Sequence, residues 1–490
     1  MIKRLNTKVL IFLVIIIITS CYLLISTTIG NGKFTIVKSL FSYNQKELIK
    51  KYIFPYKYIS LQQELINKLE DELAWKQKNV DIKFDRELYF KHLNQNGLNS
   101  LELELNALSK LKSIPVKKTD IIKLSNNKEL HKFQIYSGFY RGIHYDFPGS
   151  GYIDFYKDKI VLLSAHGILA VNDSPKLEDE TPFNQIPTNI NKFISFEQYV
   201  KNKDFSLKDL LIFKENILIS FIEEINENCW NTSVLIGKMN LKFIEFQKLF
   251  SPSECIHEKN NLDLEFNATQ SGGRIIEFEN DSILLSVGDY RSRFLAQDVK
   301  SINGKILKIN INSGQYKLIS IGHRNPQGLF FDKPNNIIFS TEHGPRGGDE
   351  VNIIEIKKIN EKNPLNYGWP ISSYGEHYGS YELNKKKYEK YPLYKSHIKH
   401  GFIEPLLSFE KSIAISEIVS VNENKYVFSS MGGDRKGGKT LFFFELNNEK
   451  KISKLEEVRI NERIRDLKFN NGNLILFLED SASIAEIYLN

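Results

Sequence analysis

The sequence predicts an all-β domain from about residue 126 to the end of the chain. Short apolar runs recur there, Gly, Asn or Asp fills most gaps between them, and no long helical period interrupts them. Strands at this spacing over about 360 residues are typical of a sandwich, a barrel or a propeller. The expected strands are Lys159–Ser164, Ile217–Ile222, Ser233–Ile236, Ile283–Val287, Lys305–Ile311, Tyr316–Ile321, Asn336–Thr341, Val351–Ile356, Lys425–Ser429, Thr440–Leu446, Asn473–Leu478 and Ala485–Leu489.

The composition is that of a globular protein with a large core. Of 490 residues, 41% are hydrophobic and 12% aromatic. The formal net charge is +7, but acidic residues are interspersed among the basic ones, and no basic block resembles a nucleic-acid-binding arm. We therefore attribute the charge to the solvated surface and expect no nucleic-acid partner.

Residues 1–30 predict a transmembrane signal anchor. Three basic residues near the start precede an uncharged apolar run, Val9–Ile25. With its Ser and Thr flanks this run is just long enough to cross the hydrocarbon core, which takes a helix of about 20 residues. Positive charge at the start keeps that end in the cytoplasm. The sequence therefore predicts that residues 9–28 lie in the membrane and that the body of the protein lies on the far side.

A cleaved signal peptide is the alternative. Ile18–Cys21 resembles the cleavage box of a bacterial lipoprotein, but Tyr22–Ile25 continue the apolar run past the cysteine. We favour the uncleaved anchor, and both alternatives export the body of the protein.

Residues 31–125 predict a helical spacer or stalk. Apolar residues between Ile59 and Leu73 recur mostly at four-residue spacing among charged residues, which is typical of an amphipathic helix. A second helical stretch is expected over Arg86–Leu111, interrupted near Gly97. The heptads are too few to predict a coiled coil.

The cysteines agree with export. Cys21 belongs to the membrane segment, which leaves Cys229 and Cys255 as the pair in the body. In an oxidising compartment these two can form a disulfide, and two buried thiols are the alternative. The histidines and cysteines show no zinc-ligand spacing.

The most informative stretch is Ile321–Tyr374. Polar side chains crowd around Gly and Pro in three successive loops, His323–Gly328, Glu342–Glu350 and Asn366–Pro370. Turn chemistry alone would explain Gly, Pro and Asp in one loop. Polar groups on rigid loops between strands usually bind a ligand, and three such loops in succession favour a binding site.

These loops carry the motifs GHRNPQG, EHGPRGGDE and NYGWP. In this order they resemble the soluble quinoprotein sugar dehydrogenases, the glucose/sorbosone dehydrogenase family, with weaker similarity from about Gln270 to the C-terminus. The resemblance implies a six-bladed β-propeller that holds pyrroloquinoline quinone (PQQ) and calcium. With the anchor, it implies a single-pass protein of a bacterial inner membrane whose propeller lies in the periplasm.

The resemblance also implies which residues hold the quinone. Arg324 and Asn325 correspond to donors to its reactive carbonyl oxygen, where charge develops as hydride arrives. Arg463 and Arg465 resemble the family's paired arginines that contact the cofactor, a task that suits a planar cation with bidentate donors. Further expected contacts are Gln270, Arg274 and Lys439, with Lys436 as the alternative to Lys439.

Calcium prefers oxygen ligands, including backbone carbonyls. By resemblance, the carbonyls of Gly344 and Pro345 would hold an ion that bridges to the quinone, and Glu350 and the carbonyl of Tyr367 would help to hold a second, structural calcium.

One position departs from the family pattern. The family carries a histidine, its general base, immediately before a Gln-Ser-Gly-Gly-Arg-like run, and here that position is Thr269. A threonine hydroxyl does not act as a base near neutral pH, and loss of a general base typically costs about 10²–10⁴-fold in rate. Either another group substitutes, with His323 and His343 in neighbouring loops, or turnover has been lost.

The sequence thus predicts hydride transfer from an aldose or a related polyol to PQQ on the periplasmic side of the membrane, with an electron acceptor that it does not identify. One alternative is a catalytically silent propeller that still binds quinone, calcium or sugar, which Thr269 favours. The other is a purely structural propeller, which the arginines disfavour. If a quinone site exists, its residues should converge at one mouth of the propeller: Thr269, Arg324, Asn325, Gly344, Arg463 and Arg465.

Overall fold

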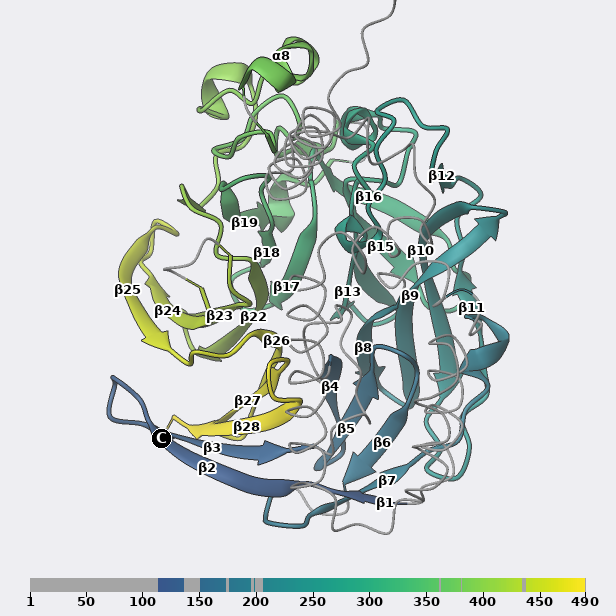
Figure 1. Cartoon of the computed structure of the whole chain (residues 1–490), viewed down its shortest axis with the longest axis vertical. Helices are drawn as coiled ribbons and strands as arrows, with labels where there is room; N and C mark the ends of the chain where they lie inside the picture. The colour runs from purple at the N-terminus through teal and green to yellow at the C-terminus, as the bar shows by residue number, and fades with distance from the viewer. Residues whose placement is uncertain are drawn as a thin grey trace, which may run out of the picture. The chain divides into compact units, whose positions relative to one another are not determined.

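The computed structural model describes residues 113–135, 150–172, 176–194, 198, 206–360, 363–379, 381–433 and 438–489. Their strands form six sheets, which are the blades of an all-β propeller (Figure 1). The expected six-bladed fold is confirmed. The predicted anchor, residues 9–28, and the predicted spacer up to residue 112 lie outside the described residues. Within the described ranges, no helix is long and apolar enough to cross a membrane.

The first three blades hold the strands from the N-terminal half. Blade one contains β1 (Ser113–Pro115), β4 (Gly151–Tyr156), β5 (Lys159–Ser164), β6 (Leu169–Asn172) and β7 (Pro182–Gln185). Blade two contains β8 (Leu207–Phe213), β9 (Asn216–Asn226), β10 (Cys229–Lys238), β11 (Phe246–Phe250) and β12 (Ile256–His257). Blade three contains β13 (Gly272–Phe278), β14 (Ser282–Val287), β15 (Lys305–Asn310), β16 (Tyr316–Ile321) and β20 (Leu365–Asn366).

The remaining blades complete the ring. Blade four contains β17 (Pro326–Asp332), β18 (Ile337–Glu342), β19 (Asp349–Glu355) and β21 (Leu407–Phe409). Blade five contains β22 (Ile415–Asn422), β23 (Lys425–Ser430), β24 (Thr440–Leu446) and β25 (Ile452–Arg459). Blade six contains β26 (Ile464–Asn470), β27 (Asn473–Leu478), β28 (Ser483–Tyr488), β3 (Glu129–Gln134) and β2 (Lys117–Lys123). A ten-residue helix, α8 (Tyr381–Lys390), lies between blade-three and blade-four strands in the sequence.

Blade six joins the two ends of the described chain. β28 pairs antiparallel with β3, so strands from near residue 130 and near residue 485 share one sheet (Figure 1). β1 and β2 begin at Ser113 and Lys117, inside the segment that the sequence predicts as helical spacer, so the propeller starts before residue 126. The seven residues of β2 are all exposed, so no alternation of buried and exposed residues marks it as a strand.

The six inner strands, β4, β8, β13, β17, β22 and β26, contact one another in this order around the propeller axis, and β26 returns to β4. Hydrophobic side chains fill the spaces between neighbouring blades. One such cluster joins Phe339 of β18 to Phe428 of β23 and Phe442 of β24. The polar residues of interest therefore lie on the inner strands and on the loops that lead into them.

Candidate active site at one end of the propeller axis

The residues predicted for a quinone site lie at one end of the inner strands. They stand just before an inner strand or at its start: Thr269 and Gln270 before β13, Arg324 and Asn325 before β17, and Arg463 and Arg465 before and within β26. His343 follows β18, which runs antiparallel to β17 and so returns to the end where β17 begins. The topology therefore brings these residues to one end of the ring.

Three arginines surround the imidazole of His343. Arg324 donates from Nη1 to the backbone carbonyl of His343 at 2.8 Å. Burial and the positive charges of Arg324, Arg465 and Arg463 lower the His343 pKa to about 3. Its Nε2 lies 2.6 Å from the carbonyl oxygen of Ile415, which only accepts, so Nδ1 is the unprotonated nitrogen. Nδ1 has no hydrogen-bond partner among the described residues, and a neutral imidazole with a free lone pair thus stands among three cations.

Glu479 holds two of these arginines. Its carboxylate accepts from Nε of Arg463 at 3.0 Å and from Nε of Arg465 at 2.6 Å. Burial alone would raise the pKa of Glu479, but the charges of the two arginines and the Ser150 hydroxyl lower it to about 2. Arg463 also donates to the carbonyl of Met431 at 2.7 Å. The terminal nitrogens of Arg465 bond to no described residue, so one carboxylate orients both cations and leaves the outer edge of Arg465 open.

Contacts with neighbouring residues hold Asn325 and Arg324 in place and leave some of their hydrogen-bond donors unused. Asn325 Oδ1 accepts from the backbone N–H of Gly272 at 3.1 Å and from Nε2 of Gln327 at 2.9 Å. Two donors on the oxygen fix the orientation of the amide, and its Nδ2 donors have no partner in the described part of the chain. The guanidinium carbon of Arg324 lies 5.4 Å from the ring centre of Trp369, a cation–π contact.

Thr269 lies inside a short turn and bonds to the residue that caps it. Its backbone N–H and its hydroxyl both donate to Asn267 Oδ1, at 2.8 and 2.5 Å. Asn267 is the N-cap of the short η2 turn (Ala268–Gln270), so these bonds stabilise the turn that leads into β13. Gln270, the last residue of that turn, is 5% exposed. Nothing in these contacts makes Thr269 a base.

The two histidines expected as substitutes for the base differ. His323 is fully buried, with Nε2 2.8 Å from Ser320 Oγ and Nδ1 3.1 Å from Glu342, and its ring stacks on Tyr367. Both of its ring nitrogens are engaged, whereas His343 keeps Nδ1 open. The structure favours His343 over His323 as the group that meets a ligand.

Lys439 lies beside the arginine pair. Its Nζ forms an ion pair with Asp480 Oδ2 at 2.7 Å, and the same oxygen accepts from the backbone N–H of Arg463 at 2.8 Å. The alternative, Lys436, lies outside the described residues. The ammonium group of Lys439 has three donors, so it can also bond an anionic ligand while it stays paired with Asp480.

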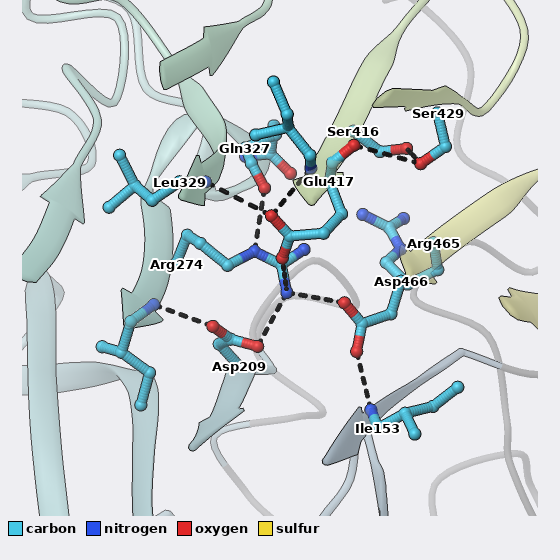
Figure 2. A network of polar contacts seen from close by, with 12 residues as sticks. Ile153, Asp209, Arg274, Gln327, Leu329, Ser416, Glu417, Ser429, Arg465 and Asp466 are labelled. Atoms are coloured by element: carbon cyan, nitrogen blue, oxygen red, sulfur yellow. Dashed lines mark hydrogen bonds and ion pairs between the residues drawn. The ribbon is translucent and has the colours of Figure 1, made fainter. Parts of the chain in front are cut away.

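Arg274 lies deeper along the axis and faces carboxylates instead of a ligand (Figure 2). Its Nη1 lies 2.8 Å from Asp209, 2.7 Å from Glu417 and 2.8 Å from Asp466. Its Nε donates to the carbonyl of Gln327 at 3.0 Å, and its side chain is 4% exposed. Three carboxylates thus share one nitrogen, while Nη2 bonds to no described residue, and the contact between Arg274 and the cofactor stays a prediction.

This carboxylate layer links all six inner strands. Four of its members are each the third residue of an inner strand: Asp209 in β8, Arg274 in β13, Glu417 in β22 and Asp466 in β26. In all four strands the register to the neighbouring strand shifts at this position, as in a β-bulge, which releases backbone groups from the ladder. The N–H groups of Ile153 in β4 and Leu329 in β17 donate to Asp466 and Glu417, which brings in the last two strands.

The carbonyls predicted to hold a bridging calcium already accept hydrogen bonds. The oxygen of Gly344 accepts from Nη1 of Arg324 at 2.5 Å, and that of Pro345 from the hydroxyl of Tyr378 at 3.2 Å. A carbonyl has two lone pairs, so one remains on each.

The predicted ligands of the second calcium also lie together. Glu350 and the carbonyl of Tyr367 flank the same side chain, His397. In the described ranges, no group of three or more His, Cys, Asp or Glu side chains is placed to hold a metal ion.

Several residues of this region escaped the sequence analysis. Glu479 follows β27, and its N–H donates to the carbonyl of Arg463 at 2.9 Å across the β26–β27 hairpin. The register of that hairpin would have identified it. His397 and the carboxylates around Arg274 have no motif of their own.

Cys229, at the start of β10, is joined to Cys255 by a disulfide that spans 26 residues. It fastens blade two to the segment that precedes β12, on the chain that leads to Thr269.

A family model described as glucose / sorbosone dehydrogenase matches residues 214–488, more than half of the chain. Aldose sugar dehydrogenase YliI of Escherichia coli is 25% identical over 293 residues, which are 54% of this chain and 71% of that protein. Quinoprotein glucose dehydrogenase B of Acinetobacter calcoaceticus is 34% identical over 85 residues, 15% of this chain and 16% of that protein.

The fold agrees with the sequence match. The crystal structure of the soluble aldose sugar dehydrogenase from Escherichia coli, in its apo form, matches with a TM-score of 0.53 at 19% identity, over 69% of this chain and 96% of that chain. That likeness shows a shared propeller, and the family model covers the strands that carry His343 and the three arginines. The chain belongs to the glucose/sorbosone dehydrogenase family.

Proposed function

We propose that the protein is a PQQ-dependent dehydrogenase that oxidises an aldose or a related polyol. The observation that carries the proposal is the group of three arginines around His343, with which Glu479 alone among the described carboxylates forms ion pairs. Such a surplus of positive charge suits a ligand with several carboxylates. Membership of the family, and relatives named for aldose sugar and quinoprotein glucose dehydrogenases, support this cofactor and substrate class.

The chain's own residues fit the parts of such a cofactor. The open edge of Arg465 suits a carboxylate, which bonds to a guanidinium in a bidentate way. Arg324 and the free Nδ2 donors of Asn325 suit the reactive carbonyl oxygen, because donors held in place before reaction stabilise the charge that develops there. When bound, PQQ supplies a quinone carbonyl group that accepts hydride from the substrate carbon.

The substrate hydroxyl must also lose a proton. The Thr269 hydroxyl donates to Asn267 and is not basic, so we propose that Nδ1 of His343 takes this proton while Nε2–H stays bonded to the carbonyl of Ile415. Without a ligand, the arginines hold the His343 pKa low. Carboxylates bound to those arginines would offset their charge and raise the pKa of His343 toward the range that a general base needs.

Calcium is part of the proposal at one place. The carbonyls of Gly344 and Pro345 offer hard oxygen ligands next to Arg324, each with one lone pair left. If an ion bridges them to the cofactor, removal of calcium with a chelator should weaken PQQ binding to the full-length protein.

Thr269 favours the alternative of a silent propeller that binds quinone without turnover. Titration of the full-length protein with PQQ, followed by cofactor absorbance and by reduction of an artificial dye with a panel of sugars, separates the two. Binding with turnover supports the dehydrogenase. Binding without turnover that Thr269→His restores would establish the silent propeller, and absence of binding would exclude both.

We also propose that residues 9–28 anchor the protein in a bacterial inner membrane and that the propeller works in the periplasm. The apolar N-terminal run with basic residues before it supports this. The disulfide between Cys229 and Cys255 supports it independently, since such bonds persist in oxidising compartments. Protease treatment of intact spheroplasts should remove the propeller if it faces the periplasm.

A further inference from the structure

His397 occupies the space between two predicted metal ligands. It precedes the short η5 turn (Ile398–His400), and its side chain is 1% exposed. Its Nδ1 lies 2.9 Å from the carbonyl oxygen of Tyr367, and its Nε2 lies 3.4 Å from Oε1 of Glu350. The ring therefore bridges the two oxygen donors that the family resemblance assigns to a second calcium.

Both partners of the His397 ring are oxygen atoms. A carbonyl oxygen only accepts, so Nδ1 donates to Tyr367. At 3.4 Å, Nε2 lies beside Oε1 of Glu350 without a close hydrogen bond. No described Lys or Arg pairs with Glu350, so His397 is its basic neighbour.

Other contacts fix the imidazole in this place. The ring of Tyr374 stacks on it, with centroids 5.4 Å apart and planes 16° apart. The backbone N–H of His397 donates to Glu404 at 3.1 Å, and the hydroxyl of Tyr374 donates to the same carboxylate at 3.2 Å. On the far side of Glu350, Nδ2 of Asn352 lies 3.4 Å from its second oxygen. The ring cannot leave without breaking this set of contacts.

We propose that the ring of His397 occupies this site and that the protein binds no calcium between Glu350 and Tyr367. Calcium takes about six to eight oxygen ligands at roughly 2.3–2.6 Å. The histidine ring fills that shell with carbon and nitrogen. One side chain thus does what an ion would do there, because it ties Glu350 of β19 to the loop that carries Tyr367.

Calcium-dependent unfolding of the full-length protein tests the proposal. The unfolding midpoint is measured by circular dichroism in a chelator and in added calcium chloride, for the wild type, Glu350→Gln and His397→Ala. If calcium raises the unfolding midpoint of the wild type, Glu350→Gln should show the same rise, because Glu350 holds no calcium. His397→Ala should lower the midpoint in chelator by about 5 °C or more. It should also gain a rise with calcium that the double variant His397→Ala/Glu350→Gln lacks.

His400→Ala is the matched control, because His400 lies in the same turn, is exposed, and stacks on Tyr394 without a carboxylate partner in the described chain. It should change neither the midpoint nor the calcium response. If His397→Ala does not fold, His397→Gln, which keeps a donor for Tyr367 but no charge, takes its place. A calcium-induced rise in the wild type that Glu350→Gln abolishes would overturn the proposal. So would a His397→Ala protein as stable as the wild type. These readouts do not depend on PQQ binding or turnover.

Discussion

The propeller axis carries arginines at two levels, Arg274 in the deeper layer and Arg463 with Arg465 at the end. The ratio of carboxyl groups to arginines is opposite at the two levels. Arg274, at the third position of its strand, has three carboxylates within 2.8 Å of one nitrogen. At the end of the axis, Arg463 and Arg465 share a single carboxylate, Glu479 (Figure 2 shows Arg465 at the edge of the deeper layer). Three carboxyl groups contact the one guanidinium of Arg274, whereas at the end two guanidinium groups share one carboxylate.

The difference shows that an arginine on the axis does not by itself mark a ligand site. Arg274 pairs with carboxyl groups of three other inner strands, so it holds inner strands together. Arg465 keeps donors that nothing in the described chain uses, so it has capacity for a ligand. The number of carboxylates around each guanidinium, which only the fold reveals, separates a structural cation from a binding one.

Removing Arg274 should produce the largest effect. In Arg274→Met the buried group of Asp209, Glu417 and Asp466 loses its central cation and keeps only the neighbouring Lys468. Removing one partner from such a buried group costs about 3–5 kcal/mol. Urea unfolding of the full-length protein measures it. Arg465→Met is the control and should cost clearly less, because Arg463 still pairs with Glu479. Equal losses of unfolding free energy in the two variants would show that Arg274 and Arg465 do not differ in their structural role.

Acid unfolding should isolate the pair at the end of the axis. The pKa of Glu479 is lowered to about 2 in the folded protein, so its stabilising effect is complete above the unfolded pKa, near 4.5, and is lost as the pH falls toward 2. For the wild type this group alone should account for roughly 3 kcal/mol of lost stability over that range. Glu479→Gln should lack that part of the acid dependence in urea titrations at stepped pH. If Glu479→Gln loses stability with falling pH as the wild type does, the lowered pKa of Glu479 does not cause that loss.

His343→Gln tests whether the arginine-rich end is catalytic. If Nδ1 takes the substrate proton, kcat should fall about 100-fold while PQQ affinity stays within a few-fold, since the lost group acts in the proton-transfer step. Dye-linked steady-state kinetics and a cofactor titration measure the two quantities. His400→Gln, at an exposed position, is the control. A fall in affinity that matches the fall in kcat would assign His343 to binding.

Glu417→Gln should show the opposite pH dependence. Burial, with Asp466 and Asp209 nearby, raises the Glu417 pKa to about 8 against the charge of Arg274. A raised pKa means that its contribution is complete below the unfolded pKa, near 4.5, and is lost as the pH rises through 8. The variant should therefore gain roughly 3 kcal/mol of stability relative to the wild type between pH 5 and pH 8, measured by urea unfolding. A variant less stable at pH 8 than at pH 5, relative to the wild type, would refute the assignment.

The strands differ in how far the sequence could predict them. Every strand expected from an apolar run is present, and β5, β16, β24 and β27 have the expected bounds. None of the six inner strands was expected. Strands in the middle of a blade are packed on both faces and read as continuous apolar runs, as in the fully buried β18. An inner strand such as β8, LKDLLIF, carries a charged residue at its third position, and its register shift breaks the alternation.

The sequence predicted only those residues of the candidate site that lie in or beside recognisable motifs. Arg324, Asn325, Arg463 and Arg465 lie in or beside recognisable loops, and the structure brings them to one end of the ring. Their partners could not be found in this way, because Glu479 meets the arginine pair through strand register and His397 meets Glu350 through a distant loop. Sequence distance is also a poor guide to the surroundings of Arg274. It follows Gln270 by four residues, yet those residues carry it into the layer below the site.

Blade six, which joins strands from both ends of the described chain, imposes an order on assembly. The side chain of Gln134, at the end of β3, bonds to the carbonyl of Ser481, 347 residues later. During synthesis β2 and β3 therefore leave the ribosome long before β28 can pair with them, and an unpaired strand edge is a template for aggregation. β2, KKTDIIK, carries three lysines and an aspartate along an exposed edge, and such charges discourage pairing with another chain. These charges protect the outer edge of blade six, whereas the edge of β3 stays open until β28 has been made.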